Sequence, residues 1–68
     1  MSISEIIHEK RLALGLSKRR LGAAVGVSHV SIVYWETGRK VPMEKHRRAL
    51  ALLFQLPVDV LTPQKAVA

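Results

Sequence analysis

Apolar residues recur along this chain at helical spacing, in short segments that glycine, proline or serine separates. Their intervals of three and four predict five helices, at about residues 3–14, 18–25, 28–37 and 42–55 and from Pro57 onward. Gly15, Gly26 and Gly38 follow three of these segments, where helices commonly end at glycine. No segment alternates strictly between apolar and polar residues, as a half-buried strand would. The pattern predicts an all-α fold, with residues 1–62 as one domain and 63–68 as a frayed tail.

Residues 17–38 are the most informative part of the pattern. Ser17 and Ser28 stand where N-caps are expected, ahead of two short helices that meet at the pair Gly26-Val27. The apolar residues that would lie between these helices are Leu21, Val25, Val27, Ile32 and Trp35. This layout is typical of a helix-turn-helix motif that binds DNA.

Length, charge and residue types narrow the classes of function. The chain has 68 residues and a formal net charge of +6, which suits a polyanionic partner. It has no cysteine, and its three histidines lack the spacing of metal ligands, so neither a metal nor another cofactor is expected. The acidic residues are dispersed and there is no glycine-rich phosphate loop, which argues against an enzyme. With no signal-peptide layout and no long apolar run, we expect the bacterial cytoplasm or nucleoid.

A family resemblance rests on an ordered set of short motifs between residues 3 and 62. The set comprises Leu14-Gly15-Leu16-Ser17, Gly26-Val27-Ser28, Ile32, Trp35-Glu36, Gly38 and Pro57-Val58-Asp59. Single motifs are weak signals, but the set at this spacing resembles the DNA-binding domain of lambda-type phage repressors and Cro proteins, also called XRE-type regulators. The resemblance implies a compact five-helix bundle whose second and third helices form the DNA-reading pair.

The third predicted helix carries the residues expected to read bases. Because Ile32 and Trp35 face the core, Val30, Val33 and Tyr34 lie on the opposite face and are base-reading candidates. His29 joins them at the N-terminal tip, and the cap residue Ser28 is the fifth candidate. Valine can contact the thymine methyl group, and Tyr34 can bond a phosphate or lie along a sugar. His29 either contacts a base edge or is only solvated, and Ser28 either contacts DNA or only caps the helix. Two valines and a tyrosine on an exposed face favour a binding role for this helix.

Phosphate contacts are expected from three basic clusters. The candidates are Lys18, Arg19 and Arg20 at the start of the second helix, Arg39 and Lys40 in the loop after the third helix, and Lys45 in the fourth helix. Free N–H groups and the helix dipole favour an anion at the first cluster. Many relatives have glutamine at the position of Lys18, so the resemblance implies a backbone contact there without the glutamine-mediated network. In the run 45–48 only the first one or two residues, Lys45 above all, are expected to contact phosphate, because a charge run is usually a solvated face.

Three positions are expected to hold the bundle together. Arg11 and Glu36 are charged residues on inward-leaning positions, and the resemblance implies that they pair across the bundle; the alternative is that Arg11 is one more phosphate contact. Gly22 lies one turn before Gly26 on the side of the second helix that faces the third. A small residue is required there for close helix packing, and the family usually has alanine.

The segment 49–61 is almost entirely apolar. One helix face cannot bury all of its large residues, which include Leu50, Leu52, Leu53 and Phe54. We therefore expect a twofold homodimer, with the candidate interface residues Leu52, Leu56, Pro57, Val58 and Val60. Its two reading helices would lie about 34 Å apart and bind a palindromic operator.

These features predict a small dimeric transcriptional regulator, Cro-like or repressor-like, that occupies an operator in double-stranded DNA. No small-molecule ligand is expected. A membrane partner is not expected either, because the basic clusters do not share one helix with a strong apolar stripe. The alternative is a protein-interaction module of the antitoxin or anti-repressor type that holds an acidic protein. Duplex binding and its salt dependence discriminate between the two functions.

Overall fold

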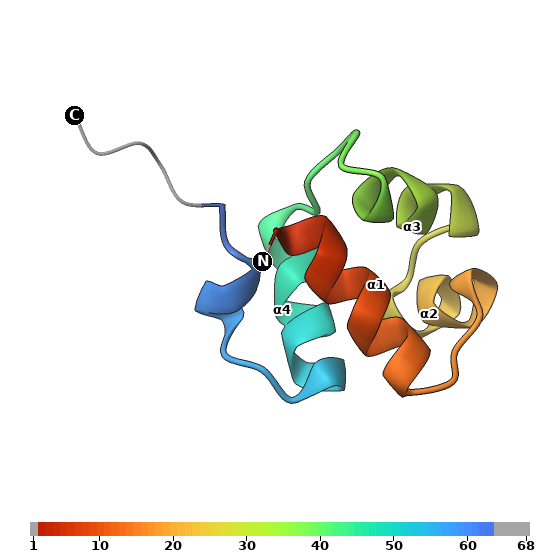
Figure 1. Ribbon diagram of the computed structural model, residues 1–68, viewed down its shortest axis with the longest axis horizontal. Coiled ribbons are helices and arrows are strands. Elements are labelled where there is room, and N and C mark those ends of the chain that lie inside the picture. The colour runs from red at the N-terminus through yellow and green to blue at the C-terminus, as the bar shows by residue number, and fades with distance from the viewer. Residues whose placement is uncertain (1, 64–68) are drawn as a thin grey trace.

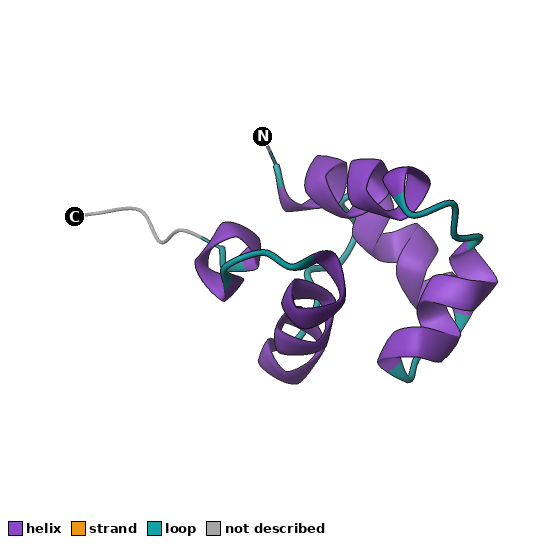
Figure 2. Cartoon of the chain, turned by 90° about the horizontal axis from the view of Figure 1, so that it is seen from below, coloured by secondary structure: helices purple, strands orange, loops and turns teal. Residues whose placement is uncertain are grey.

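The computed structural model describes residues 2–63, which form four α-helices and one short 3₁₀ helix (Figures 1 and 2). The elements are α1 (Ile3–Ala13), α2 (Lys18–Val25), α3 (His29–Glu36), α4 (Glu44–Phe54) and the 3₁₀ helix η1 (Val58–Leu61). Within this part of the chain no residue lies in a strand, and none of the helices is both long and apolar enough to cross a bilayer. The all-α prediction is confirmed. Apart from Pro63, the predicted frayed tail lies outside the described residues.

Two of the five predicted helices need correction. The fifth is a 3₁₀ helix of four residues, and the fourth begins at Glu44 rather than at Pro42. Pro42 is fully buried, and its carbonyl oxygen accepts a hydrogen bond of 2.6 Å from Arg47 Nη1. The proline therefore anchors the preceding loop against the core, and Met43 takes the N-cap position. Tertiary packing overrides the local preference of proline for a first helical turn.

Serine and glycine set the ends of the shorter helices. Ser17 Oγ accepts a hydrogen bond of 3.1 Å from Arg20 N, and α2 ends at Gly26 with a φ of 82°, so both of its predicted ends are confirmed. Ser28 occupies the N-cap position of α3, but its hydroxyl makes no capping bond within the described chain. At α1 the cap is Ser2, whose Oγ accepts from Glu5 N at 3.2 Å while the Glu5 carboxylate accepts from Ser2 N. This reciprocal capping box fixes the start of α1.

The core lies where the four α-helices and η1 meet. Its buried apolar side chains are Ile7, Leu21, Val25, Ile32, Trp35, Leu50, Ala51, Phe54 and Leu61. α2 packs mainly against α3, and α1 crosses in front of α4 with contacts to α3 and η1 (Figure 1). Val27 is half-buried and packs at the edge of this core. The burial of Ile32 and Trp35 turns the opposite face of α3 away from the bundle.

Gly22 of α2 lies against the backbone of the turn that leads into α3. A Cβ atom at this position would lie 2.6 Å from the carbonyl oxygen of Val27, which is closer than real contacts allow. The Gly22 carbonyl also accepts a hydrogen bond of 2.8 Å from Val27 N. A side chain at position 22 would therefore meet backbone atoms of the turn, and the hydrogen bond holds this turn against α2.

Candidate nucleic-acid interface

The outer face of α3 is less exposed than its sequence pattern predicts. Val30 is 44% exposed and Ser28 is exposed, whereas His29, Val33 and Tyr34 are half-buried. Val33 lines a cleft together with His8 of α1 and Lys18 of α2. Of the five base-reading candidates, Val30 is thus the most exposed apolar side chain, and Ser28 precedes the helix at its N-cap position.

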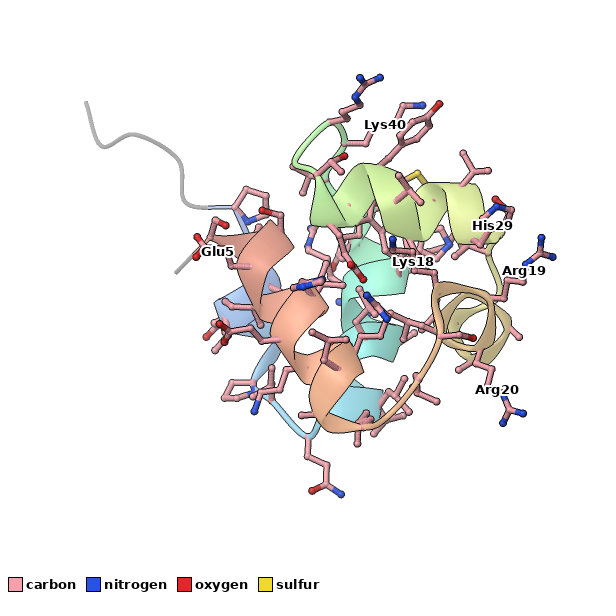
Figure 3. The ribbon with its side chains drawn as sticks, turned by 45° about the vertical axis from the view of Figure 1, so that its right-hand side comes forward. Glu5, Lys18, Arg19, Arg20, His29 and Lys40 are labelled. Carbon is pink, nitrogen blue, oxygen red and sulfur yellow. The ribbon has the colours of Figure 1, made fainter. Side chains whose placement is uncertain are left out.

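Tyr34 ties the loop after α3 to the same face. Its carbonyl oxygen accepts hydrogen bonds from Arg39 N at 2.9 Å and Lys40 N at 3.3 Å. Lys40 Nζ lies 5.2 Å from the centre of the Tyr34 ring, a cation–π contact that sets the lysine beside the tyrosine (Figure 3). The loop is therefore held in place, and it presents two cations at the end of the reading helix.

The six phosphate candidates are all exposed, and none takes part in the ion pairs found among residues 2–63. Lys18, Arg19 and His29 lie where α2 and α3 adjoin, while Glu5 lies on the opposite side of the view (Figure 3). The first turn of α2 contains no acidic residue. Three cations at the positive end of a helix repel one another and the helix dipole. An anion bound there would relieve this repulsion.

The run 45–48 divides into four different environments. The His46 ring lies 5.5 Å from the Trp35 ring, and the half-buried Arg47 holds the Pro42 carbonyl. Arg48 Nη2 pairs with the Glu44 carboxylate of the preceding turn at 2.7 Å. Lys45 is the exposed cation of the run without an ion pair in the described chain. His46, Arg47 and Arg48 thus make their contacts within the protein, to Trp35, Pro42 and Glu44.

Arg11 and Glu36 lie in contact, although 25 residues separate them. Arg11 Nε donates to Glu36 Oε2 at 2.6 Å and Nη2 donates to Oε1 at 3.1 Å, while Nη1 donates to the Leu16 carbonyl at 2.9 Å. The two side chains are 9% and 5% exposed. The guanidinium is thus engaged inside the bundle, which favours a structural role for Arg11 over a phosphate contact.

His8 completes this buried pair and was missed by the sequence reasoning. Its Nδ1 lies 2.7 Å from Glu36 Oε1, and its side chain is 49% exposed. Burial of the Glu36 carboxylate acts to raise its pKa, but the hydrogen bonds from Arg11 and His8 outweigh this effect and hold the pKa below its ordinary value. The sequence feature that could have indicated this contact is the position of His8, one helical turn before Arg11 and on the same face of α1.

The candidate dimer residues are only partly covered within one chain. Leu52 is 83% exposed, Val60 41% and Val58 36%, and Pro57 is also exposed. Leu56 is half-buried and packs against the core. By contrast, Leu50 and Phe54 of the same apolar segment are buried by the chain itself. One protomer therefore covers part of the segment and leaves Leu52 as its most exposed large apolar residue.

The helix-turn-helix family matches residues 7–61, so the chain belongs to this family. This chain is similar to a solved structure of the P22 c2 repressor protein in complex with the synthetic operator 9T in the presence of Tl⁺. The TM-score is 0.85 and the sequence identity is 33%. The similarity covers 90% of this chain and 92% of the other. A comparison with curated protein sequences found no match.

Proposed function

We propose that this chain binds double-stranded DNA sequence-specifically and regulates transcription as a Cro-like or repressor-like protein in the bacterial cytoplasm or nucleoid. The observation that carries the proposal is the similarity, over 90% of this chain, to a repressor in complex with a synthetic operator. The family match over residues 7–61 supports the same function. The fold is that of a DNA-binding regulator, and the proposal includes no catalytic step.

In the proposed complex α3 lies in the major groove, and Val30 contacts a thymine methyl group. Its 44% exposure and its place in the first turn of the helix support this role. His29 and Ser28 lie at the N-terminal end of the helix, where base contacts of this motif occur. Val33 and Tyr34, being half-buried, contact bases or sugars at the edges of this surface.

The six exposed cations, which form no ion pair within residues 2–63, lie at the start of α2, in the loop after α3 and at the start of α4, and they bind the DNA backbone. Lys18, Arg19 and Arg20 contact phosphates from the start of α2. Arg39 and Lys40 do so from the loop that Tyr34 holds in place. Lys45, exposed at the start of α4, is the sixth contact. Phosphate contacts of this kind fix the orientation of the protein on the duplex, while α3 supplies the sequence preference.

Two protomers bind a palindromic operator, joined at the surface around Leu52. The exposed apolar side chains Leu52, Val58 and Val60, with Pro57 and the half-buried Leu56, support this interface. Leu52→Asp is expected to shift the chain to monomer in sedimentation equilibrium and to abolish cooperative binding to two half-sites. Leu12→Asp is the matched control, because Leu12 is also exposed, at 55%, but lies on α1. An unchanged oligomeric state in Leu52→Asp would place the dimer contact elsewhere.

The test of the proposed function is selection of bound duplexes from a random DNA pool at about 0.15 M salt, followed by affinity measurement against a scrambled duplex. An enriched palindrome bound at least ~10³-fold more tightly than the scrambled sequence supports an operator-binding regulator. Half-sites about 34 Å apart support the dimer. Weak salt-sensitive binding without enrichment contradicts the proposal and favours an acidic protein partner instead.

A further inference from the structure

A small cleft lies where α1, the start of α2 and the end of α3 meet. It has a volume of about 250 Å³ and is lined by His8, Lys18, Val33, Glu36 and Thr37. Lys18 is a phosphate candidate and Val33 a base-reading candidate, so the cleft opens beside the proposed DNA surface. His8 lies in its wall, 49% exposed, and no role in DNA binding has so far been given to it.

The ring of His8 has a defined orientation. A carboxylate can only accept hydrogen bonds, so the 2.7 Å contact with Glu36 Oε1 requires the proton on Nδ1. Arg11 Nη2, which lies 3.5 Å from the same Nδ1, is also a donor and so does not bond it. Nε2 is then the ring nitrogen left for an external partner. It accepts when the imidazole is neutral and donates when it is protonated.

We propose that His8 is a DNA-backbone contact whose protonated Nε2 donates a hydrogen bond to a phosphate oxygen at this cleft, beside Lys18. The proposal rests on the proposed DNA binding and adds a residue of α1 to it. A phosphate oxygen offers only lone pairs, so the neutral ring, with its proton held on Nδ1, has no donor for it. Binding at this phosphate therefore requires the protonated form of His8.

The charges around His8 determine how its protonation is coupled to DNA. Glu36 on α3 stabilises the protonated ring, whereas Arg11 on α1 and Lys18 on α2 oppose it. Glu5, one turn earlier on α1, is engaged with Ser2. A phosphate placed beside His8 and Lys18 adds a second anion, besides Glu36, next to the ring. DNA binding and protonation of His8 then favour each other, and affinity rises as the pH falls.

The contact is tested on the full chain with the operator found by duplex selection. Single methylphosphonate linkages, which remove the charge of one phosphate, are placed along the operator, and each duplex is measured with the wild type and with His8→Gln. The loss caused by His8→Gln, expected to be about threefold or more at about pH 6, should disappear for one linkage per half-site and persist for the others. Lys10→Gln is the matched control, since Lys10 is an exposed cation of α1 that lines a different cavity.

The pH dependence is measured in a His29→Asn background, so that the histidine of α3 does not contribute. Affinity is expected to rise about threefold or more between about pH 8 and pH 6, and His8→Gln is expected to remove this rise. His8→Lys carries a charge throughout that range and should bind with little pH dependence. The log–log salt slope at about pH 6 should also be smaller by about 0.9 in His8→Gln, because this variant neutralises one phosphate fewer.

Three results would overturn the inference. Equal affinities of the wild type and His8→Gln across this pH range exclude the contact. A loss that is the same for every methylphosphonate duplex and follows a lower Tm assigns His8 a purely structural role. If the wild type itself selects no duplex, the proposed function fails and this inference fails with it, whereas operator binding without a His8 effect leaves the proposed function standing.

Discussion

Arg11 and Glu36 join α1 to the last turn of α3 through two hydrogen bonds, of 2.6 and 3.1 Å, between a guanidinium and a carboxylate that are almost inaccessible to solvent. Arg11 also donates to the Leu16 carbonyl, so the same side chain fixes the loop that leads into α2. A charge buried in this way is tolerated because it is paired and hydrogen-bonded. The pair therefore sets the position of the reading helix relative to α1 and α2.

Removing one partner of this pair should destabilise the fold. Arg11→Met would leave the Glu36 carboxylate buried without its main donor, and the free energy of unfolding is expected to fall by about 3–5 kcal/mol, as seen by urea denaturation. Arg48→Met is the control, because the Arg48–Glu44 pair is exposed and should contribute less than about 1 kcal/mol. An unchanged Tm in Arg11→Met would refute the structural role. Base preference, measured on the selected operator, should change less than stability does.

The lowered pKa of Glu36 predicts an acid-sensitive part of the stability. Its folded-state pKa lies below the ordinary value of 4.5, so ionised Glu36 stabilises the folded state fully above pH 4.5. This contribution is lost as the pH falls from 4.5 through the folded-state pKa. The difference in unfolding free energy between the wild type and Glu36→Gln should therefore shrink as the pH falls. Glu5 also has a lowered pKa, owing to its hydrogen bonds with Ser2, but it is common to both proteins and cancels in the difference.

That measurement consists of urea titrations from about pH 6 to about pH 2.5. A difference that stays constant over this range would mean that the Glu36 carboxylate gains no net stabilisation from Arg11 and His8. Glu44→Gln serves as the control, because Glu44 is two-thirds exposed and its effect should be small throughout.

The close approach of Gly22 to the turn predicts a strong position effect within α2. Gly22→Val places a Cβ atom 2.6 Å from the Val27 carbonyl oxygen and adds two methyl groups, so the turn must shift. The expected decrease in unfolding free energy is about 2 kcal/mol or more, with a lower Tm by calorimetry. Ala23→Val, at the next, exposed position of the same helix, should cost less than about 1 kcal/mol. A decrease in Gly22→Val no larger than that in Ala23→Val would show that the approach of the turn does not restrict residue 22.

Readout of a thymine methyl by Val30 predicts a matched pair of effects. Replacing thymine by uracil at one position of each operator half-site should lower affinity by about threefold to tenfold, and Val30→Ala should lower it by a similar factor. The double change should then cost little more than either single change, as a shared contact requires. If no uracil position weakens binding and Val30→Ala binds normally, the methyl contact does not exist.

The contrast between Lys45 and Arg48 predicts different salt dependences for two variants of equal charge. Lys45→Ala removes an exposed cation that has no ion pair within the described residues, and it should reduce the log–log salt slope by about 0.9, the value for one phosphate that is no longer neutralised. Arg48→Ala removes a cation that is paired with Glu44, and its slope should stay near that of the wild type. Binding titrations from about 50 to 200 mM salt measure both. Equal slopes in the two variants would remove Lys45 from the interface.

Local signals in the sequence were sufficient to predict α2 but not the start of α4. Both ends of α2 were predicted, because Ser17 and Gly26 act through bonds and dihedral angles within a few residues of themselves. The start of α4 was predicted wrongly, because Pro42 has a local preference for a first helical turn but its burial and its bond to Arg47 hold it in the loop. Met43 offers no capping hydroxyl that would have marked the true start.

The sequence by itself determined the all-α class, the α2–turn–α3 unit and the inward positions of Ile32 and Trp35, because these follow from hydrophobic periodicity and from residues that cap or end helices locally. Only the tertiary structure decided which charges are used inside the bundle. His8 of α1 meets Glu36 of α3 across 28 residues. Such pairings depend on how separate helices cross, since a side chain's partner on another helix is set by packing geometry and not by spacing along its own helix.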